Sequence, residues 1–199
     1  MEKFRGKYSV SSHRAQWWDY SEDAAYFITI CTINKELYFG EIANQNMCLS
    51  AVGKIARRCW REIPNHFSHV SLGAFIVMPN HIHGILILNG GNKGSELNSM
   101  KNENINVETR LALSLQNKNA NNLLHPGNNR FQNMGKNSVS AIVGSYKSAV
   151  TKQANRKNLP NGWQPLFYDR IIRSKTEFNR IERYIFLNPL VWKDEDFYK

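Results

Sequence analysis

Two histidines placed two residues apart are the side chains in this sequence best suited to chemistry. His81 and His83 lie in the apolar run 75–88, which reads Phe-Ile-Val-Met-Pro-Asn-His-Ile-His-Gly-Ile-Leu-Ile-Leu. Alternate side chains of a β-strand point to one face, so both imidazoles would stand side by side and could share one metal ion. The simpler alternative is a pair of hydrogen-bonded core histidines, because a buried polar ring needs a partner.

A second polar group follows helical spacing near the end of the chain. Ser174 and Glu177 have the spacing of a capping box, which predicts the start of a helix there. Its buried stripe would consist of Phe178, Ile181 and Ile185. A neighbouring face would carry Glu177, Arg180, Tyr184 and Asn188. Because Tyr184 and Asn188 are one turn apart, the amide could reach a metal ion while the phenol approaches a phosphorus atom bound to it. Two imidazoles, an amide and a phenol are sufficient for phosphoryl transfer.

The elements that must position these groups can be predicted from the hydrophobic periodicity. Strands are expected at 25–34, 70–78 and 81–88, with a further strand within 163–173 and a short partner strand at 39–42. Pro79-Asn80 would join the second and third strands as a hairpin. Helices are expected at 51–63, capped by Ser50, and from Ser138 to about Arg156.

Length and composition favour a single domain with a polyanionic partner. The chain has 199 residues, and 26 Lys and Arg against 16 Asp and Glu give a formal net charge of +10. The exposed cations expected to contact phosphates are Lys147, Lys152, Arg156 and Arg170. The alternative for them is a solvated basic face.

Cysteine content and hydropathy indicate a reducing compartment. The three cysteines form no CxxC pair, and the apolar runs are too short for a signal peptide or a membrane span. We therefore expect a cytoplasmic protein that does not associate with membranes. Residues 91–135 contain twelve Asn and little apolar periodicity, which predicts an insertion acting as a spacer; a nucleic-acid clamp is the alternative.

Five ordered segments resemble the HUH single-strand transposases, and within them the REP-associated tyrosine transposases. They are Tyr-Phe-Ile-Thr-Ile-Cys-Thr from 26, Phe-Gly-Glu-Ile from 39, Val-Met-Pro-Asn-His-Ile-His-Gly-Ile from 77, Trp-Gln-Pro-Leu-Phe-Tyr-Asp from 163, and Tyr-Ile-Phe-Leu-Asn-Pro from 184, followed by Trp192. The resemblance covers most of the chain. A lone HxH pair is a weak motif, whereas the ordered set is specific.

This resemblance implies a complete site and reaction. The fold would be α+β and ferredoxin-like, a central antiparallel sheet with helices packed on one face. His81 and His83 match the metal pair, Asn188 the residue that assists the metal, and Tyr184 the nucleophile. The reaction would be Mg²⁺- or Mn²⁺-dependent cleavage of hairpin-forming single-stranded DNA, leaving a 5′-phosphotyrosine and a free 3′-hydroxyl for strand transfer. Relatives that act on two DNA ends are often dimers, so the resemblance also allows a homodimer.

Two other functions compete with this interpretation. One is a ferredoxin-like nucleic-acid-binding protein whose chemistry has lapsed. The other is a two-histidine hydrolase of small molecules, which is disfavoured because a third histidine or carboxylate at suitable spacing is missing and the basic charge has no role. Formation of a covalent protein–DNA adduct separates the first interpretation from both.

Overall fold

A four-stranded antiparallel sheet forms the centre of the protein. The computed structural model describes residues 19–89 and 137–192, so the predicted insertion at 91–135 lies outside it. The strands follow the order β4-β5-β1-β6. They are β1 (Ala24–Cys31), β4 (Val70–Val77), β5 (His81–Leu88) and β6 (Tyr168–Ile172). The predicted hairpin through Pro79-Asn80 is confirmed, since β4 and β5 are antiparallel neighbours.

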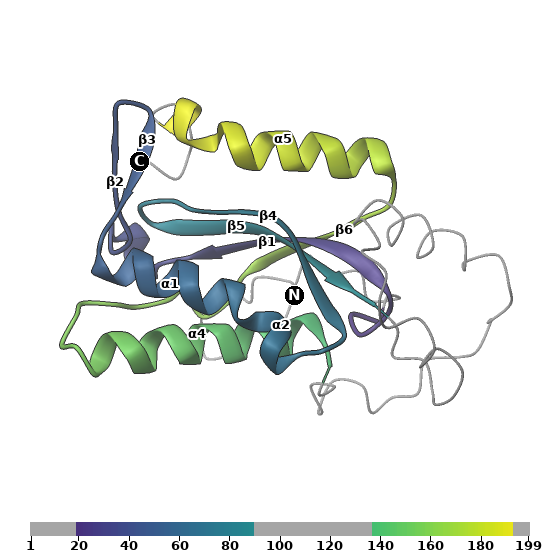
Figure 1. Cartoon of the computed structure of the whole chain (residues 1–199), viewed down its shortest axis with the longest axis horizontal. Helices are drawn as coiled ribbons and strands as arrows, with labels where there is room; N and C mark the ends of the chain where they lie inside the picture. The colour runs from purple at the N-terminus through teal and green to yellow at the C-terminus, as the bar shows by residue number, and fades with distance from the viewer. Residues whose placement is uncertain (1–18, 90–136, 193–199) are drawn as a thin grey trace, which may run out of the picture.

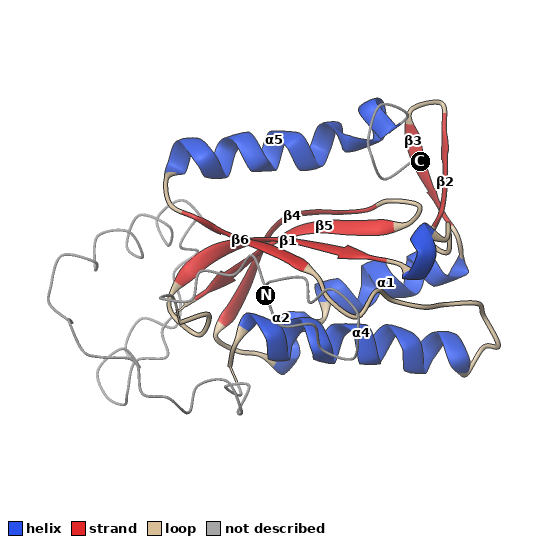
Figure 2. Cartoon of the chain, turned by 180° about the vertical axis from the view of Figure 1, so that it is seen from behind, coloured by secondary structure: helices blue, strands red, loops and turns tan. Residues whose placement is uncertain are grey.

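Helices cover both faces of this sheet. The helices α1 (Ala51–Arg61) and α4 (Val139–Asn155) lie on one side, and α5 (Lys175–Val191) lies alone on the other (Figure 1). Figure 2 shows the same three layers from behind. The α+β class with an antiparallel sheet is therefore confirmed, but the expectation of helices on only one face is wrong. The residues of β5 are buried along the whole strand, as expected for a central strand covered on both sides.

Alternation along the strands divides the buried residues between two cores. Tyr26, Ile28 and Ile30 of β1 belong to the larger core under α1 and α4. Ala25 and Phe27 belong to the smaller core under α5, which also contains Ile85, Ile87, Ile172, Phe178, Ile181 and Ile185. The sheet therefore presents odd-numbered residues of β1 and β5 to α5, and this face carries both histidines.

The predicted helix starts are confirmed by their caps. The Ser50 hydroxyl accepts a hydrogen bond from the Gly53 amide at 3.0 Å, and the Ser138 hydroxyl accepts one from the Ala141 amide at 3.3 Å. At α5 the Ser174 hydroxyl accepts from the Glu177 amide at 3.1 Å. Among the helices in the described ranges, none is long and apolar enough to cross a membrane.

One sequence prediction of a strand is wrong in detail, and another is confirmed for only part of its range. Residues 39–42 do not pair with the first strand: β2 (Gly40–Ala43) pairs with β3 (Asn46–Leu49) in a separate two-stranded sheet. A tight turn with positive φ at Asn44 and Gln45 makes this local pairing available. The strand expected within 163–173 is restricted to β6; before it, Trp163 forms only an isolated bridge with Thr32.

Candidate active site

The two histidines lie side by side beneath α5, near the start of β5. The ring centroids of His81 and His83 are 4.4 Å apart, and the two side chains are 0% and 2% exposed. The sequence motif therefore produces the common face that strand geometry predicts. The core-histidine alternative also predicts that both rings are buried. The hydrogen bonds and neighbours of the rings must therefore distinguish a metal-binding pair from a structural pair.

The hydrogen bond of His81 with Asn80 selects one tautomer of that ring. Asn80 donates from Nδ2 to the carbonyl of Lys35 at 3.3 Å, so its Oδ1 faces His81, whose Nδ1 lies 2.8 Å away. An amide oxygen only accepts, and His81 Nδ1 therefore carries the proton. On the other ring, Nδ1 of His83 lies 2.9 Å from the Thr29 hydroxyl. With Nδ1 protonated, His81 keeps its lone pair on Nε2, as in histidines that bind metal ions. The Thr29 hydroxyl can donate or accept, so it fits either tautomer of His83.

Burial keeps both rings neutral. Desolvation lowers the pKa of His81 to about 3, although a side-chain hydrogen bond with Asn188 raises it in part. Desolvation, together with the neighbouring His81, also holds the pKa of His83 well below its usual range. At neutral pH both imidazoles are therefore uncharged, with one nitrogen protonated and the other bearing a lone pair. This is the form that can ligate a metal.

Helix α5 brings Tyr184 and Asn188 to these rings. The Tyr184 phenol oxygen lies 3.3 Å from Nε2 of His83, and the side chain is 37% exposed. Asn188 is fully buried, and its side-chain amide acts on the pKa of His81. Each histidine thus faces one polar residue of the helix, and the phenol combines a contact with the site and access to solvent. A purely structural histidine pair would not require that access.

Aromatic rings form the walls of the site. Phe27 stacks on His83 with centroids 5.3 Å apart, and meets the Tyr184 ring edge-on at 6.1 Å. Trp192 stacks on His81 at 5.8 Å. These contacts fix the ring planes of the histidines and of the tyrosine.

The donor set of the site fits a divalent cation. Within residues 19–89 and 137–192, no cluster contains three or more His, Cys, Asp or Glu side chains able to hold a metal. The available donors are Nε2 of His81, Nε2 of His83 and the amide oxygen of Asn188. Imidazole nitrogens and an amide oxygen can serve as ligands of a divalent cation when water and substrate phosphate complete its coordination shell.

Only one of the four predicted DNA-binding residues lies on the face of the sheet that carries the site. Arg170 does so, because it is opposite Phe27 in the β1–β6 register, and it pairs with Glu177 at 2.7 Å. Lys152 and Arg156 are exposed on α4, across the sheet from the histidines. Lys147 has a structural task instead, since its ammonium donates to the carbonyls of residues 164, 165 and 166.

Sequence reasoning missed the residues that support the site. Thr29 and Phe27 lie in a strand whose pattern indicates only alternation, and the β1–β5 register that sets Thr29 opposite His83 is a long-range property. The sequence indicates Asn80 only as a turn residue. Its position next to His81 was the one signal that could have indicated a hydrogen-bonding role.

Comparison with known proteins supports this description at the level of fold. One solved structure, a REP-associated tyrosine transposase bound to a REP hairpin, matches with a TM-score of 0.54 and 16% identity, over 91% of this chain and 73% of that one. A candidate transposase from Deinococcus radiodurans matches 86% of this chain and 94% of its own with 15% identity, but its TM-score of 0.35 is too low to indicate a shared fold. The protein therefore has the α+β fold of a tyrosine transposase.

Its family is defined by a sequence relative. The chain is 31% identical over 198 residues to an uncharacterized protein of Haemophilus influenzae, which covers 96% of this chain and 97% of the relative. The protein belongs to the same family as that relative. No protein-family model matches the chain.

Proposed function

We propose that this protein is a metal-dependent tyrosine nuclease and strand transferase for single-stranded DNA. Tyr184 is the nucleophile, and His81, His83 and Asn188 hold the divalent ion. The observation that carries the proposal is the 3.3 Å distance between the Tyr184 oxygen and Nε2 of His83, because it joins a partly exposed phenol to a buried donor set. The fold shared with a tyrosine transposase is consistent with it.

The chemistry begins with attack of the Tyr184 oxygen on a phosphorus atom. The new bond joins this oxygen to phosphorus, and the bond between phosphorus and the 3′-oxygen breaks. The proton lost by the phenol is balanced by the proton gained by the leaving 3′-oxygen, so the products are a 5′-phosphotyrosine and a 3′-hydroxyl. A bound divalent ion would withdraw charge from the phosphate and favour the phenolate.

The protein's own residues prepare this step. Asn80 and Thr29 contact the two Nδ1 atoms, which leaves both Nε2 atoms to hold the divalent ion. Phe27 contacts both the His83 ring and the Tyr184 ring, and thereby fixes the phenol relative to the donors. The covalent link conserves the phosphodiester, so attack by a later 3′-hydroxyl can reverse the reaction without another energy source.

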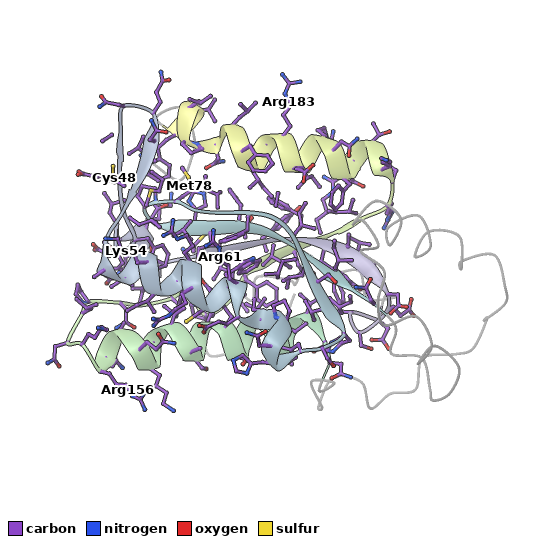
Figure 3. The ribbon with its side chains drawn as sticks, viewed as in Figure 1. Cys48, Lys54, Arg61, Met78, Arg156 and Arg183 are labelled. Carbon is purple, nitrogen blue, oxygen red and sulfur yellow. The ribbon has the colours of Figure 1, made fainter. Side chains whose placement is uncertain are left out.

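The DNA partner would be held by a basic surface on α1 and α4. We define the α1–α4 basic face by its exposed cations Lys54, Arg57, Arg58, Arg61, Lys152, Arg156 and Lys157. Neither helix contains an acidic residue, and the carboxylate of Glu62 at the end of α1 is paired with Arg58 at 3.9 Å, so the face is strongly positive. Figure 3 shows Lys54, Arg61 and Arg156 on this side and Arg183 extending from α5 on the other. On the face of the site, Arg170 is paired with Glu177 at 2.7 Å and adds little net positive charge.

A labelled, hairpin-flanked single strand provides the direct test. Incubation with the protein and Mn²⁺ should give a protein–DNA complex that survives denaturation, and chelation or a fully duplex substrate should prevent it. A catalytically lapsed binding protein would instead retard the strand on a native gel without any denaturation-resistant product. That result would refute the proposal.

A further inference from the structure

A cleft runs along the free edge of the central sheet, beside β6. Its volume is about 520 Å³, within the range of small-ligand sites. The lining comprises Tyr20, Tyr168, Asp169, Arg170, Ile171, Arg173 and Glu177. Because β6 is the last strand in the order β4-β5-β1-β6, the cleft lies at an edge of the sheet that the described residues form.

The register of the sheet connects this cleft to the candidate active site. Tyr168 is opposite Thr29 in the β1–β6 pairing, and Thr29 is opposite His83 in the β1–β5 pairing. The three side chains therefore form one row on the α5 face. Neighbouring strands are about 4.8 Å apart, so the row places the backbone of Tyr168 roughly 10 Å from that of His83. A strand whose phosphate lies at Tyr184 could reach the cleft within a short stretch.

The charges of the cleft do not favour a phosphate. Arg170 and Arg173 are balanced by the carboxylates of Asp169 and Glu177. Glu177 pairs with Arg170 at 2.7 Å and accepts a hydrogen bond from the Arg173 amide at 3.0 Å. A neutral cleft rich in hydrogen-bonding groups is better suited to an uncharged, flat and polar group.

The aromatic lining supplies a surface for such a group. Tyr168 is 47% exposed, although it lies on a strand whose other face is packed. Tyr20 forms a second aromatic part of the lining and rests on Tyr26, with ring centroids 5.8 Å apart. Exposed tyrosine rings are sequence-tolerant stacking platforms for unpaired bases.

We propose that this cleft binds one unpaired nucleobase of the DNA strand, with Tyr168 as the stacking residue. The inference rests on the proposed function, because it identifies where the strand beside the cleaved phosphate is held. The base stacks on Tyr168, and the arginine and carboxylate groups of the lining hydrogen-bond its edge. The base in the cleft therefore lies at a fixed position relative to the cleaved bond.

A fluorescence experiment tests this binding without cleavage. The protein used is the Tyr184→Phe variant, and the strands carry 2-aminopurine at successive positions along the hairpin-flanked sequence. Stacking should quench the fluorescence strongly at one position near the cleavage point. Tyr168→Leu in the same background should remove this quenching and weaken binding roughly tenfold, whereas Tyr168→Phe should retain both. Phe186→Leu, which changes an exposed aromatic residue of α5, is the matched control.

A double-mutant cycle decides whether the two partners meet. Replacing the quenched base by an abasic site should weaken binding as much as Tyr168→Leu, and the two changes together should cost no more than one. Additive losses, or no position-specific quenching, would overturn the inference. These readouts are separate from catalysis: a protein that forms the tyrosine adduct but shows neither effect refutes the cleft alone, and one that shows both without forming an adduct refutes the nuclease alone.

Discussion

The phenol oxygen of Tyr184 and Nε2 of His83 lie 3.3 Å apart, although the residues are separated by 101 positions in the chain. Packing of α5 on the sheet through Phe178, Ile181 and Ile185 produces this contact. The candidate nucleophile is therefore positioned by the same apolar stripe that holds the helix in place. Its geometry depends on the tertiary fold rather than on a local motif.

Replacing Tyr184 by Phe should abolish DNA cleavage and leave affinity for the strand within a few fold. Only the phenol oxygen is lost, and a partly exposed hydrogen bond contributes about 1 kcal/mol to folding. A cleavage assay, a binding titration and thermal unfolding measure the three quantities. Full activity of the variant would move the nucleophile elsewhere, and Tyr168 would be the next residue to replace.

Replacing either His81 or His83 by Ala should remove Mn²⁺-dependent cleavage and weaken Mn²⁺ binding. The two remaining protein donors hold a hard divalent ion poorly. Calorimetric titration with Mn²⁺ measures the loss, and circular dichroism checks that each variant is folded.

The matched control for the histidine variants is His66→Ala, because His66 is exposed on α2 (Ile63–His66), outside the site. This variant should bind Mn²⁺ like the unchanged protein. Since both site rings are buried, His81→Gln and His83→Gln serve as variants that keep more of the side-chain volume. If Mn²⁺ binding is unchanged in every variant, His81 and His83 have a structural role.

Sequence predicted the local parts of this site well. The face shared by His81 and His83 follows from strand periodicity, and the start of α5 follows from Ser174. The positions of Thr29 and Phe27 beside His83 depend instead on strand register, which hydrophobic pattern alone does not specify.

The side of the sheet on which each helix packs could not be predicted from the sequence either. Both α4 and α5 have an apolar stripe, but neither stripe indicates which face of the central sheet the helix will cover. The separation of Arg170 from Lys147, Lys152 and Arg156 could therefore not be predicted from the sequence. In the structure, α4 and β6 differ in position: Lys152 and Arg156 lie on α4 across the sheet from the site. Arg170 pairs with Glu177, and Lys147 donates to a backbone carbonyl.

Acidification should destabilise the metal-free protein from about pH 6.5 downwards. The folded pKa of His81 is about 3, below the ordinary value of 6.5, and that of His83 is lowered in the same direction. The unfolded chain therefore binds more protons as the pH falls through this window, and the free energy of unfolding decreases by up to about 1.4 kcal/mol per pH unit for each ring.

Urea unfolding at pH 7.0, 6.0 and 5.0 measures this dependence, in a range where most carboxylates stay ionised. The His81→Gln and His83→Gln double variant should show a flatter profile than the unchanged protein. Parallel profiles would mean that the two rings do not account for the pH dependence.

Affinity for single-stranded DNA should fall steeply with salt if the α1–α4 basic face contacts phosphates. The slope of log affinity against log salt changes by about 0.7 for each phosphate neutralised, because binding releases counterions. Lys152→Gln with Arg156→Gln should flatten the slope, and so should Arg57→Gln with Arg61→Gln. Arg183→Gln, on the outer side of α5, is the control (Figure 3). If both pairs of substitutions leave the slope unchanged, the face is only solvated.

The most direct test of the central claim is to identify the amino acid that becomes attached to DNA. The protein is incubated with a hairpin-flanked single strand and Mn²⁺, denatured and digested, and the nucleotide-bearing peptide is sequenced by mass spectrometry. We predict a single phosphodiester link at Tyr184, with the 5′ end of the cleaved strand. Attachment at another residue, or complete cleavage without any attached peptide, would contradict the assignment of Tyr184 as the nucleophile.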